Sequence, residues 1–444
     1  MSNNNVNEPS VRVGILAAPA ITVRLSGVFH TSDGTAVEGT QKFELADSRI
    51  LWNGNAHDSL LFEASSAECR FEIEDVVIGV NFHWERRENQ TFAGNLAFVV
   101  EKGMLEAVNI VKVEQYLKSV ISSEMSATAS ESLLRAHAVI SRSWLLAQIE
   151  KHTGIDTGTV EVHDMVVNDK EICRWQDRED HVLFDVCADD HCQRYQGMTR
   201  QTTDAVDKAV EETRGLILTD SDGKLCDTRF SKCCGGVFEE FENCWEPKHY
   251  HYLEAARDSE EPAAYPDLTI EENARAWILG SPEAFCNTHD KEILGQVLNN
   301  YDQETTDFYR WTVEYGQEEL AELIRTRSGI DYGGIRSLEP VVRGTSGRIV
   351  QMRIVGTKRT MLIGKELEIR RTLSTSHLYS SAFVVEPGPA GADGLPVSFR
   401  LRGAGWGHGV GLCQIGAAVM GAKGYDYRRI LAHYFHDSTL TKLY

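Results

Sequence analysis

The segment Gly403-Ala-Gly-Trp-Gly-His-Gly-Val-Gly411 has a glycine at every second position, and it is the most unusual feature of the chain. In an extended strand, successive side chains point to opposite faces, so one face of this segment would carry no side chain. Glycine in a strand costs conformational entropy and packs against nothing, so the repeat implies that something lies close to this face. Two explanations stay open: a bound ligand, or a core strand packed tightly against another part of the protein.

A nucleotide site is not predicted at this segment. The spacing of its glycines matches neither the dinucleotide-binding fingerprint nor the P-loop, and no lysine follows at the required position. Trp406 and His408 project from the face opposite the glycines. The tryptophan offers either a surface on which a sugar ring stacks or, as is more common, an anchor in the core.

The composition is that of an ordinary soluble globular protein of two or three lobes. The chain has 444 residues, of which 42% are hydrophobic and 25% are charged. Asp and Glu total 66 against 45 Lys and Arg, which gives a formal charge of −21. Because this charge repels nucleic acid and anionic lipid, we predict no nucleic-acid partner.

The beginning of the chain shows no export signal. Residues 1–9 contain neither a charged n-region nor an apolar h-region, and no stretch reaches about 18 apolar residues. We therefore predict no transmembrane segment, and either the protein is cytoplasmic or an export signal is absent from this chain. The ten cysteines do not decide the compartment, because a chain of this length does not need disulfide bonds.

The most informative carboxyl group is that of Glu124. A helix is predicted from Val113, and its apolar stripe runs through Leu117, Val120 and Ile121, with Glu124 at the next position. A carboxyl group desolvated by such neighbours keeps its proton near neutral pH and is able to donate it. The alternative is a glutamate at the helix end that turns to solvent or caps the next helix.

A second polar residue lies in the helix that follows. Arg142 falls in an apolar segment that is predicted to be helical through about Glu150. A guanidinium group in such a place either has a carboxylate or oxyanion partner or extends to the surface.

Two further segments carry candidate binding groups. His181, Cys187 and Cys192 lie within twelve residues, and thiolates with an imidazole suit zinc. The fourth ligand would be water, His191, His163 or an Asp, and structural or disulfide-bonded cysteines are the alternative. In Phe230-Ser-Lys-Cys-Cys-Gly-Gly236, the paired glycines suit either a ligand cradle or a tight β-turn.

Together these motifs resemble the SpoIID family, the stage II sporulation protein D and amidase-enhancer group that acts on bacterial peptidoglycan. Residues 403–417, continued by 424–434, are similar to the family's most recognisable signature. Residues 113–125 and 136–144 are similar to its second signature, and residues 230–236 to its Ser-x-x-Gly-Gly pattern. The similar segments extend in order from about residue 108 to 440.

The resemblance implies a lytic transglycosylase, which cleaves the β-1,4 bond after N-acetylmuramic acid (MurNAc) without water and leaves a 1,6-anhydro sugar. It places the catalytic acid at Glu124 and a second catalytic position at Arg142. It places Tyr195, Ser231, His408 and Gln414 at cleft positions. With Gly235, Gly236 and Trp406 of the segments described above, these are the candidate substrate-binding residues. It also implies a structural Zn²⁺ held by His181, Cys187 and Cys192, and a location in the cell envelope.

The chemistry implied by the resemblance agrees with the lone carboxyl group of the helix. Ordinary glycosidases need two carboxylates, one as acid and one to activate water or attack the sugar. Here the 6-hydroxyl of the sugar is the nucleophile, so one glutamate is able to protonate the leaving oxygen and then accept the hydroxyl proton. Partners would be glycan strands and a cell-wall amidase. The alternatives are a non-catalytic, glycan-binding enhancer of an amidase and an intracellular metal-binding scaffold.

Several residues depart from the usual family pattern. His137 replaces a Gln, residues 141–144 read Ser-Arg-Ser-Trp in place of Ala-Arg-Thr-Tyr, and Cys413 stands where Ser is common. None of these changes removes the acid, but they leave the substrate preference open.

The expected fold class is α+β, with mixed sheets in a barrel-like β core, packed helices and two lobes around an elongated cleft. Residues 1–10 are expected to be disordered, and residues 11–107 to form a β-rich part with alternating apolar strands. Residues 108–440 would form the SpoIID-like domain. This domain would include a cysteine-bearing insertion at about 155–200 and a helical insertion at about 258–330.

Overall fold

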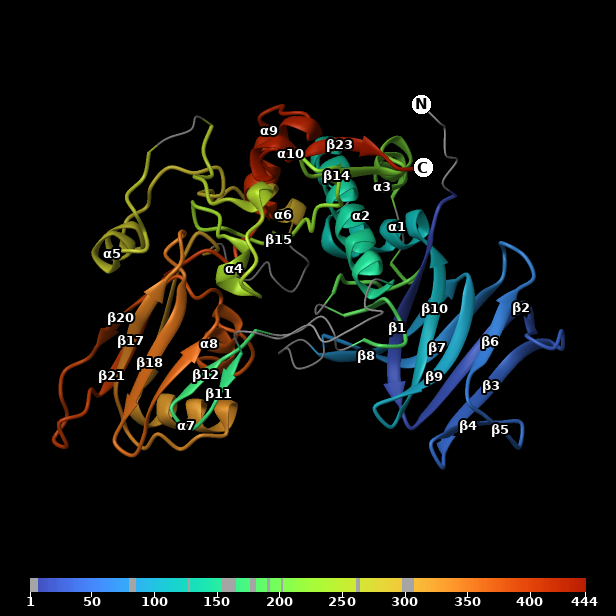
Figure 1. The fold of residues 1–444 in the computed structure, drawn as a ribbon, viewed down its shortest axis with the longest axis horizontal. Helices are drawn as coiled ribbons and strands as arrows, with labels where there is room; N and C mark the ends of the chain where they lie inside the picture. The colour runs from blue at the N-terminus through green and yellow to red at the C-terminus, as the bar shows by residue number, and fades with distance from the viewer. Residues whose placement is uncertain are drawn as a thin grey trace. The chain divides into compact units, whose positions relative to one another are not determined.

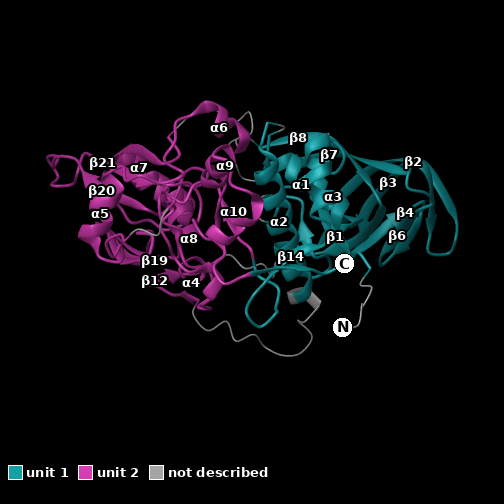
Figure 2. Cartoon of the chain, turned by 90° about the horizontal axis from the view of Figure 1, so that it is seen from above, with its two compact units in different colours: residues 1–158, 178–227, 439–444 teal, residues 159–177, 228–438 magenta. Residues whose placement is uncertain are grey.

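The computed structural model describes residues 7–79, 85–126, 128–153, 165–175, 181–189, 192–200, 203–260, 264–297 and 307–444. Helices and strands are mixed along the chain, which confirms the α+β class (Figure 1). The chain divides into two compact units (Figure 2): unit 1 comprises residues 1–158, 178–227 and 439–444, and unit 2 comprises residues 159–177 and 228–438. None of the described helices is both long and apolar enough to cross a membrane.

Unit 1 is built on an 11-stranded sheet with the main order β13-β1-β10-β9-β6-β2-β3-β4-β5. Residues 23–26 of β2 pair with β7, whereas residues 29–31 pair with β6, so β7 and β8 branch from the main path. The described strands form an open sheet and not the barrel-like core that we expected. The strands are β1 (Ser10–Ala18), β2 (Ala20–Thr31), β3 (Ala36–Ala46), β4 (Arg49–Trp52), β5 (Asn55–His57), β6 (Leu60–Ala64), β7 (Arg70–Ile78), β8 (Arg86–Ala93), β9 (Asn95–Glu101), β10 (Met104–Lys112) and β13 (Val186–Cys187).

Phenylalanine side chains fill the core beneath this sheet. The rings of Phe43 and Phe98 stack with their centroids 3.9 Å apart, and Phe62 meets Phe43 edge-on at 5.6 Å. Six phenylalanines on the strands are almost completely buried: Phe29, Phe43, Phe62, Phe71, Phe92 and Phe98. Their burial on alternate strand positions explains why the sequence pattern of residues 11–100 predicts β structure.

Three helices and a two-stranded ladder complete unit 1. The helices are α1 (Val113–Glu124), α2 (Glu131–Thr153) and α3 (Asp204–Glu212). The ladder joins β14 (Leu216–Thr219) to β23 (Thr439–Lys442) in antiparallel register, with Leu216 opposite Lys442. Residues 439–444 therefore return to unit 1, although residues 228–438, which lie between the two strands in sequence, belong to unit 2.

Unit 2 contains a five-stranded sheet of order β11-β12-β19-β18-β17 and a three-stranded sheet of order β16-β21-β20. Apolar side chains of both sheets share one core, which includes Ile349, Met352, Phe399 and Leu401. The strands are β11 (Val166–Val167), β12 (Glu171–Cys173), β15 (Phe230–Ser231), β16 (Arg310–Gly316), β17 (Ile335–Arg343), β18 (Ile349–Gly356), β19 (Thr360–Gly364), β20 (Phe383–Pro387), β21 (Ser398–Ala404) and β22 (Leu412–Cys413).

The helices of unit 2 are α4 (Phe241–Cys244), the 3₁₀ turn η2 (His251–Leu253), α5 (Glu271–Leu279), α6 (Lys291–Val297), α7 (Gln317–Ser328), α8 (Glu366–Thr372), α9 (Gln414–Ala422) and α10 (Tyr427–Tyr434). Three of them, α5 to α7, fall in the region 258–330 that we expected to be a helical insertion. This region also supplies β16, which pairs along its whole length with β21. The insertion is therefore part of a sheet as well as helical.

The glycine-rich segment is not the extended strand that its period-2 pattern predicts. β21 ends at Ala404, and Gly405, Gly407, Gly409 and Gly411 all have positive φ, between 70° and 95°. Only glycine adopts this backbone conformation readily. The alternating glycines therefore allow the chain to turn at every second residue, and they do not form a strand face without side chains. A side chain at Gly405 would lie 2.7 Å from the carbonyl oxygen of Cys233, and one at Gly407 would lie 2.9 Å from Ser231 Cβ. The close neighbour is thus protein, as the second of the two explanations requires.

Replacing Gly411 by Ala tests this requirement. The methyl group would clash with the carbonyl group of Arg229, at a position where φ is +70°. We therefore expect the free energy of unfolding to fall by about 3 kcal/mol. Gly424 is the matched control, since its φ is +87° but a side chain there meets nothing within 4 Å. Gly424→Ala should cost only about 1 kcal/mol. Chemical denaturation of the two variants measures the difference, and equal losses would contradict a tight contact at Gly411.

Candidate functional site

Helix α1 carries a carboxyl group at each end of one stripe. Glu114, Leu117, Ile121 and Glu124 are spaced three, four and three residues apart, so they share a face of the helix. Leu117 and Ile121 are completely buried, and Glu114 is almost so, whereas Glu124, the last residue of α1, is partly exposed. The stripe that the sequence predicts is confirmed, and Glu124 is the end of it that solvent reaches.

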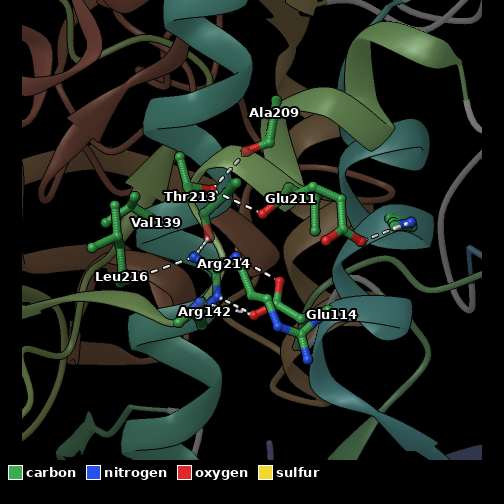
Figure 3. A network of polar contacts seen from close by, with 12 residues as sticks. Glu114, Val139, Arg142, Ala209, Glu211, Thr213, Arg214 and Leu216 are labelled. Carbon is green, nitrogen blue, oxygen red and sulfur yellow. Dashed lines mark hydrogen bonds and ion pairs between the residues drawn. The ribbon is translucent and has the colours of Figure 1, made fainter. Parts of the chain in front are cut away.

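The buried end of the stripe is the partner of Arg142. Nε of Arg142 donates to Glu114 Oε1 at 2.9 Å and Nη2 donates to Oε2 at 2.7 Å, a two-pronged ion pair between α1 and α2 (Figure 3). Nη1 of Arg142 donates to the carbonyl group of Leu216 in β14 at 2.9 Å. Arg142 is 0% exposed and therefore does not extend to the surface. Of the two alternatives for this arginine, a carboxylate partner is the one the structure shows.

Further donors complete the environment of Glu114. Its Oε1 accepts hydrogen bonds from the backbone N–H of Gly215 at 3.1 Å and from the hydroxyl group of Tyr444 at 2.6 Å. Burial opposes ionisation, but the hydrogen bond and charge of Arg142 outweigh it, and the pKa of Glu114 is lowered. A buried pair of charges with all of its polar atoms engaged holds α1, α2 and β14 in one arrangement.

Tyr195 lies in a group of aromatic rings beside α1. It is 2% exposed, its hydroxyl group donates to Asn109 Oδ1 at 2.7 Å, and its ring stacks on that of Tyr116 at 4.9 Å. Burial raises the pKa of Tyr116 well above its usual value, as do the nearby charges of Cys192, Cys187, Tyr195 and Glu124. The ring of Tyr116 in α1 thus packs against Tyr195, one of the predicted binding residues.

The structure brings the three predicted zinc ligands together. One ligand atom from each of His181, Cys187 and Cys192 lies within 4.8 Å of the others, and Cys192 Sγ is 3.7 Å from His181 Nε2. All three residues are partly exposed, which leaves room for a fourth ligand. One imidazole nitrogen and two thiol sulfur atoms at this spacing suit a tetrahedral zinc ion whose fourth coordination position is open. His163 and His191, the candidate fourth ligands, lie outside the described residues.

A cavity of about 470 Å³ adjoins this triad in unit 1, and Glu106, His181, Cys187 and Tyr195 are among the residues that line it. Glu106 belongs to β10 and is 8% exposed. Burial, followed by the negative charge of Glu101, raises the pKa of Glu106 to about 8. The carboxyl group thus keeps its proton at neutral pH. It was missed at the sequence level because a single glutamate in an alternating strand normally faces solvent.

Glu106 makes the stability of the protein depend on pH. Its folded-state pKa lies above the usual value of 4.5, so its contribution is fully present below that value and is lost as the pH rises toward 8. Glu106→Gln removes the titration but keeps the size. We therefore expect the free energy of unfolding of the variant, relative to that of the wild type, to be about 2 kcal/mol higher at pH 7 than at pH 5. Denaturant unfolding at the two pH values measures the gain, and a pH-independent difference would show that Glu106 is ionised in the folded protein.

The other predicted binding residues lie in unit 2, around the glycine-rich segment. β15 pairs in parallel with β22, so Ser231 lies opposite Cys413, and Trp406 forms a backbone bridge with Cys233. Gln414, the first residue of α9, is 1% exposed. Ser231 is 7% exposed, and nothing among the described residues is hydrogen-bonded to its hydroxyl group. The ring of Trp406 contacts those of Tyr379 and Phe308 at 4.4 and 4.7 Å, so it does act as a packing anchor.

The paired glycines of this loop are required by the backbone. Gly235 and Gly236 have φ of +82° and +108°. A side chain at Gly235 would lie 3.0 Å from the backbone nitrogen of Gly405, and one at Gly236 would lie 2.9 Å from the hydroxyl group of Tyr309. The turn explanation therefore accounts for both glycines, and a role as ligand cradle remains a prediction.

His408 is held as a neutral ring. Its Nδ1 accepts the backbone N–H of Val410 at 3.0 Å, so in the neutral form the proton is on Nε2. Burial, followed by the positive charges of Arg229, Arg348 and Arg370, keeps the pKa of His408 well below its usual value. Its ring lies edge-on to that of Trp245 at 4.9 Å. A hydrogen bond with the backbone of Phe230 acts against this lowering of the pKa but is the smaller effect, so the ring is uncharged at neutral pH.

Comparison with known proteins agrees with this arrangement of motifs. Residues 101–219, which hold α1, α2 and the cysteine-bearing loop, match the Stage II sporulation protein family, SpoIID. This segment of the chain is therefore similar to the SpoIID family, as its motifs predict. Residues 239–411 match a family described as a domain of unknown function, DUF8618.

Two relatives are similar to the chain over most of its length. An uncharacterised protein of Brachyspira hyodysenteriae is 24% identical over 345 residues, which are 78% of this chain and 71% of that protein. The amidase enhancer of Bacillus subtilis is 23% identical over 341 residues, which are 73% of this chain but only 40% of the enhancer. The chain thus corresponds to less than half of the enhancer's length.

Proposed function

We propose that this chain is a peptidoglycan lytic transglycosylase that cleaves the bond between MurNAc and N-acetylglucosamine (GlcNAc) in denuded glycan strands. The match of residues 101–219 to the SpoIID family supports a role in the bacterial cell wall, and the transglycosylase reaction is the specific form of that role that we infer. The observation that carries the proposal is the position of Glu124, the solvent-reached end of a stripe whose other end is fixed by a buried ion pair.

Glu124 is proposed as both acid and base. It gives its proton to the O4 atom of GlcNAc as the C1–O4 bond breaks, and it then takes the proton of the MurNAc 6-hydroxyl group as the O6–C1 bond forms. No water is consumed, so a second carboxylate is not required.

Arg142 is proposed as a positioning residue. Its guanidinium group is occupied by Glu114 and Leu216, so it acts on the reaction through the placement of α1. The substrate contacts are proposed to come from Tyr195, Ser231, Gly235, Gly236, Trp406, His408 and Gln414. Among these, the hydroxyl group of Ser231, which has no hydrogen-bond partner among the described residues, is the group best suited to donate to a sugar oxygen.

Zinc is proposed as a structural ion of unit 1. His181, Cys187 and Cys192 would hold it, and it would fix the loop that carries Tyr195 against the aromatic rings of α1. The location is proposed to be the cell envelope, where the glycan is found.

A second candidate function is a non-catalytic enhancer of a cell-wall amidase, which the name of the Bacillus subtilis relative favours. The deciding experiment incubates the purified protein with denuded glycan strands and analyses the products by mass spectrometry. Products ending in 1,6-anhydroMurNAc support the transglycosylase. Glycan binding and stimulation of an added amidase, without any anhydro product, would instead establish the enhancer.

A further inference from the structure

Unit 2 contains a second group of metal-binding side chains, remote in sequence from the His181 triad. One ligand atom from each of Cys234, Asp258, Cys286 and Cys413 lies within 4.8 Å of the others, and all four residues are buried. We propose that these four residues form a second metal site, which holds a divalent ion such as Zn²⁺ in tetrahedral coordination and stabilises unit 2. This site is independent of the transglycosylase proposal.

The distances between the ligand atoms fit zinc. Zn–S bonds of about 2.3 Å and Zn–O bonds of about 2.0 Å at tetrahedral angles place two sulfur atoms about 3.8 Å apart, and sulfur and oxygen about 3.5 Å apart. Cys234 Sγ lies 3.5 Å from Cys286 Sγ and 3.5 Å from Asp258 Oδ2. Three thiols and one carboxylate are also a donor set that zinc prefers over magnesium or calcium.

The charge of the group points in the same direction. Asp258 is 0% exposed, and a buried carboxylate is costly unless it is paired or coordinates a metal. His433 is the one basic group paired with it among the described residues, through Nε2 and Oδ1 at 3.2 Å. The other oxygen atom, Oδ2, accepts the backbone N–H of Cys286 at 3.1 Å and lies 3.5 Å from Cys234 Sγ, in the same group of buried thiols. A divalent cation at the centre would compensate this concentration of acidic groups.

The surroundings orient the ligands as they do in known metal sites. The outer oxygen of Asp258, Oδ1, accepts from the hydroxyl group of Tyr434 at 2.9 Å as well as facing His433, which leaves Oδ2 directed at the thiols. Ligating carboxylates typically have such hydrogen-bonded partners. A side chain at Gly416 would lie 2.6 Å from Asp258 Oδ2, so glycine is required there for the carboxylate to fit.

The ligands are also fixed by their own backbone. The N–H groups of Cys234 and Gly416 donate to Cys413 Sγ at 3.2 and 3.5 Å, so this sulfur caps the first turn of α9. Asp258 N–H donates to the carbonyl group of Gly236 at 2.9 Å, and Phe285 N–H donates to that of Asp258 at 2.7 Å. The segments that carry all four ligands are thus joined before any ion binds, which reduces the cost of ordering the site.

A disulfide bond is the competing explanation. It would join Cys234 and Cys286, whose sulfur atoms are 3.5 Å apart, whereas an S–S bond is about 2.05 Å long. A disulfide would leave Asp258 and Cys413 directed at the same point without a reason. The metal site accounts for all four groups at once, and for this reason we prefer it.

The experiment uses the full chain carrying Cys187→Ser and Cys192→Ser, which removes the His181 triad. We expect this chain to bind about one zinc or cobalt ion, measured by elemental analysis. The cobalt form should show the absorption bands of tetrahedral thiolate coordination, and removal of the metal should lower the melting temperature. Adding Cys286→Ser or Asp258→Asn should weaken metal binding at least tenfold. Adding Cys173→Ser, a buried cysteine of β12 outside the group, should leave it unchanged.

Each other outcome overturns the proposal. One such outcome is a folded protein with reduced thiols that takes up neither zinc nor cobalt. The other is a Cys234–Cys286 disulfide in the mass spectrum of the unreduced chain. Either result rejects the metal site. If the Cys286→Ser variant does not fold, the cobalt spectrum of the folded double variant decides the question alone. Catalysis is read separately from anhydro products, so failure of this site leaves the proposed function standing.

Discussion

Glu124→Gln is expected to reduce the release of 1,6-anhydro sugars from denuded glycan by about a thousandfold. Glutamine has nearly the same size and keeps the end of α1 intact, but it has no proton to give to the leaving oxygen. Because Glu124 is partly exposed, the substitution should leave the melting temperature close to that of the wild type. The measurement is product quantification by mass spectrometry over time, with the same protein samples checked for unfolding temperature.

Glu131→Gln is the matched control for this variant. Glu131 begins the next helix and has an exposed side chain that pairs with Arg135, so its loss should leave the rate unchanged. A Glu124→Gln protein that still forms anhydro products at the wild-type rate would remove Glu124 from the mechanism. The enhancer function would be favoured by two results together. The wild type would form no anhydro product, and the Glu124→Gln variant would stimulate an amidase as strongly as the wild type does.

Arg142→Met is expected to destabilise unit 1 by about 3–5 kcal/mol. The substitution leaves Glu114 buried without its ionic partner, and the remaining donors, Gly215 N–H and Tyr444 OH, do not neutralise its charge. Denaturant unfolding measures the loss. Arg135→Ala is the matched control on the same helix, because its ion pairs with the exposed Glu131 and Glu212 should together be worth no more than about 1 kcal/mol. Similar losses for the two variants would contradict a structural role for the buried pair.

The double variant Glu114→Gln/Arg142→Met separates pairing from burial. With both charges removed, we expect much of the lost stability to return, since an unpaired buried charge is the main cost in the single variant. Arg142→Lys tests the positioning role. It retains a charge but not the two-pronged contact, so kcat for glycan cleavage should fall while KM changes little. A change in KM alone would indicate that Arg142 contributes to substrate binding.

The sequence predicted the helices and the metal site whose residues lie close together along the chain. The apolar stripe of α1 and the helices of 271–328 were visible because their buried side chains recur at helical spacing. Glu114 lies on the same stripe, three residues before Leu117. The helical spacing therefore already indicated a carboxylate that was able to pair with Arg142. The triad of His181, Cys187 and Cys192 was predictable because its ligands are close in sequence.

Two features could not be read from spacing. Glycine at alternate positions is compatible with an extended strand and with repeated left-handed turns, and only the contacts of Gly405 to Gly411 decide between them. The ligands of the second metal site are 24, 28 and 179 residues apart in the pairs Cys234–Asp258, Asp258–Cys286 and Cys234–Cys413. Long-range topology brings them together, and a scan for short motifs does not detect such a site.

The pairing of β14 with β23 has a consequence for biosynthesis. The ribosome completes β14 at Thr219, but its partner begins only at Thr439, after the whole of unit 2 has been translated. During this interval the edge of β14 has unsatisfied backbone groups, and Glu114 lacks the hydroxyl group of Tyr444. Folding from the N-terminus onward, the usual order in multidomain chains, therefore cannot finish unit 1 first. Its final closure has to await the emergence of residues 439–444 from the ribosomal exit tunnel.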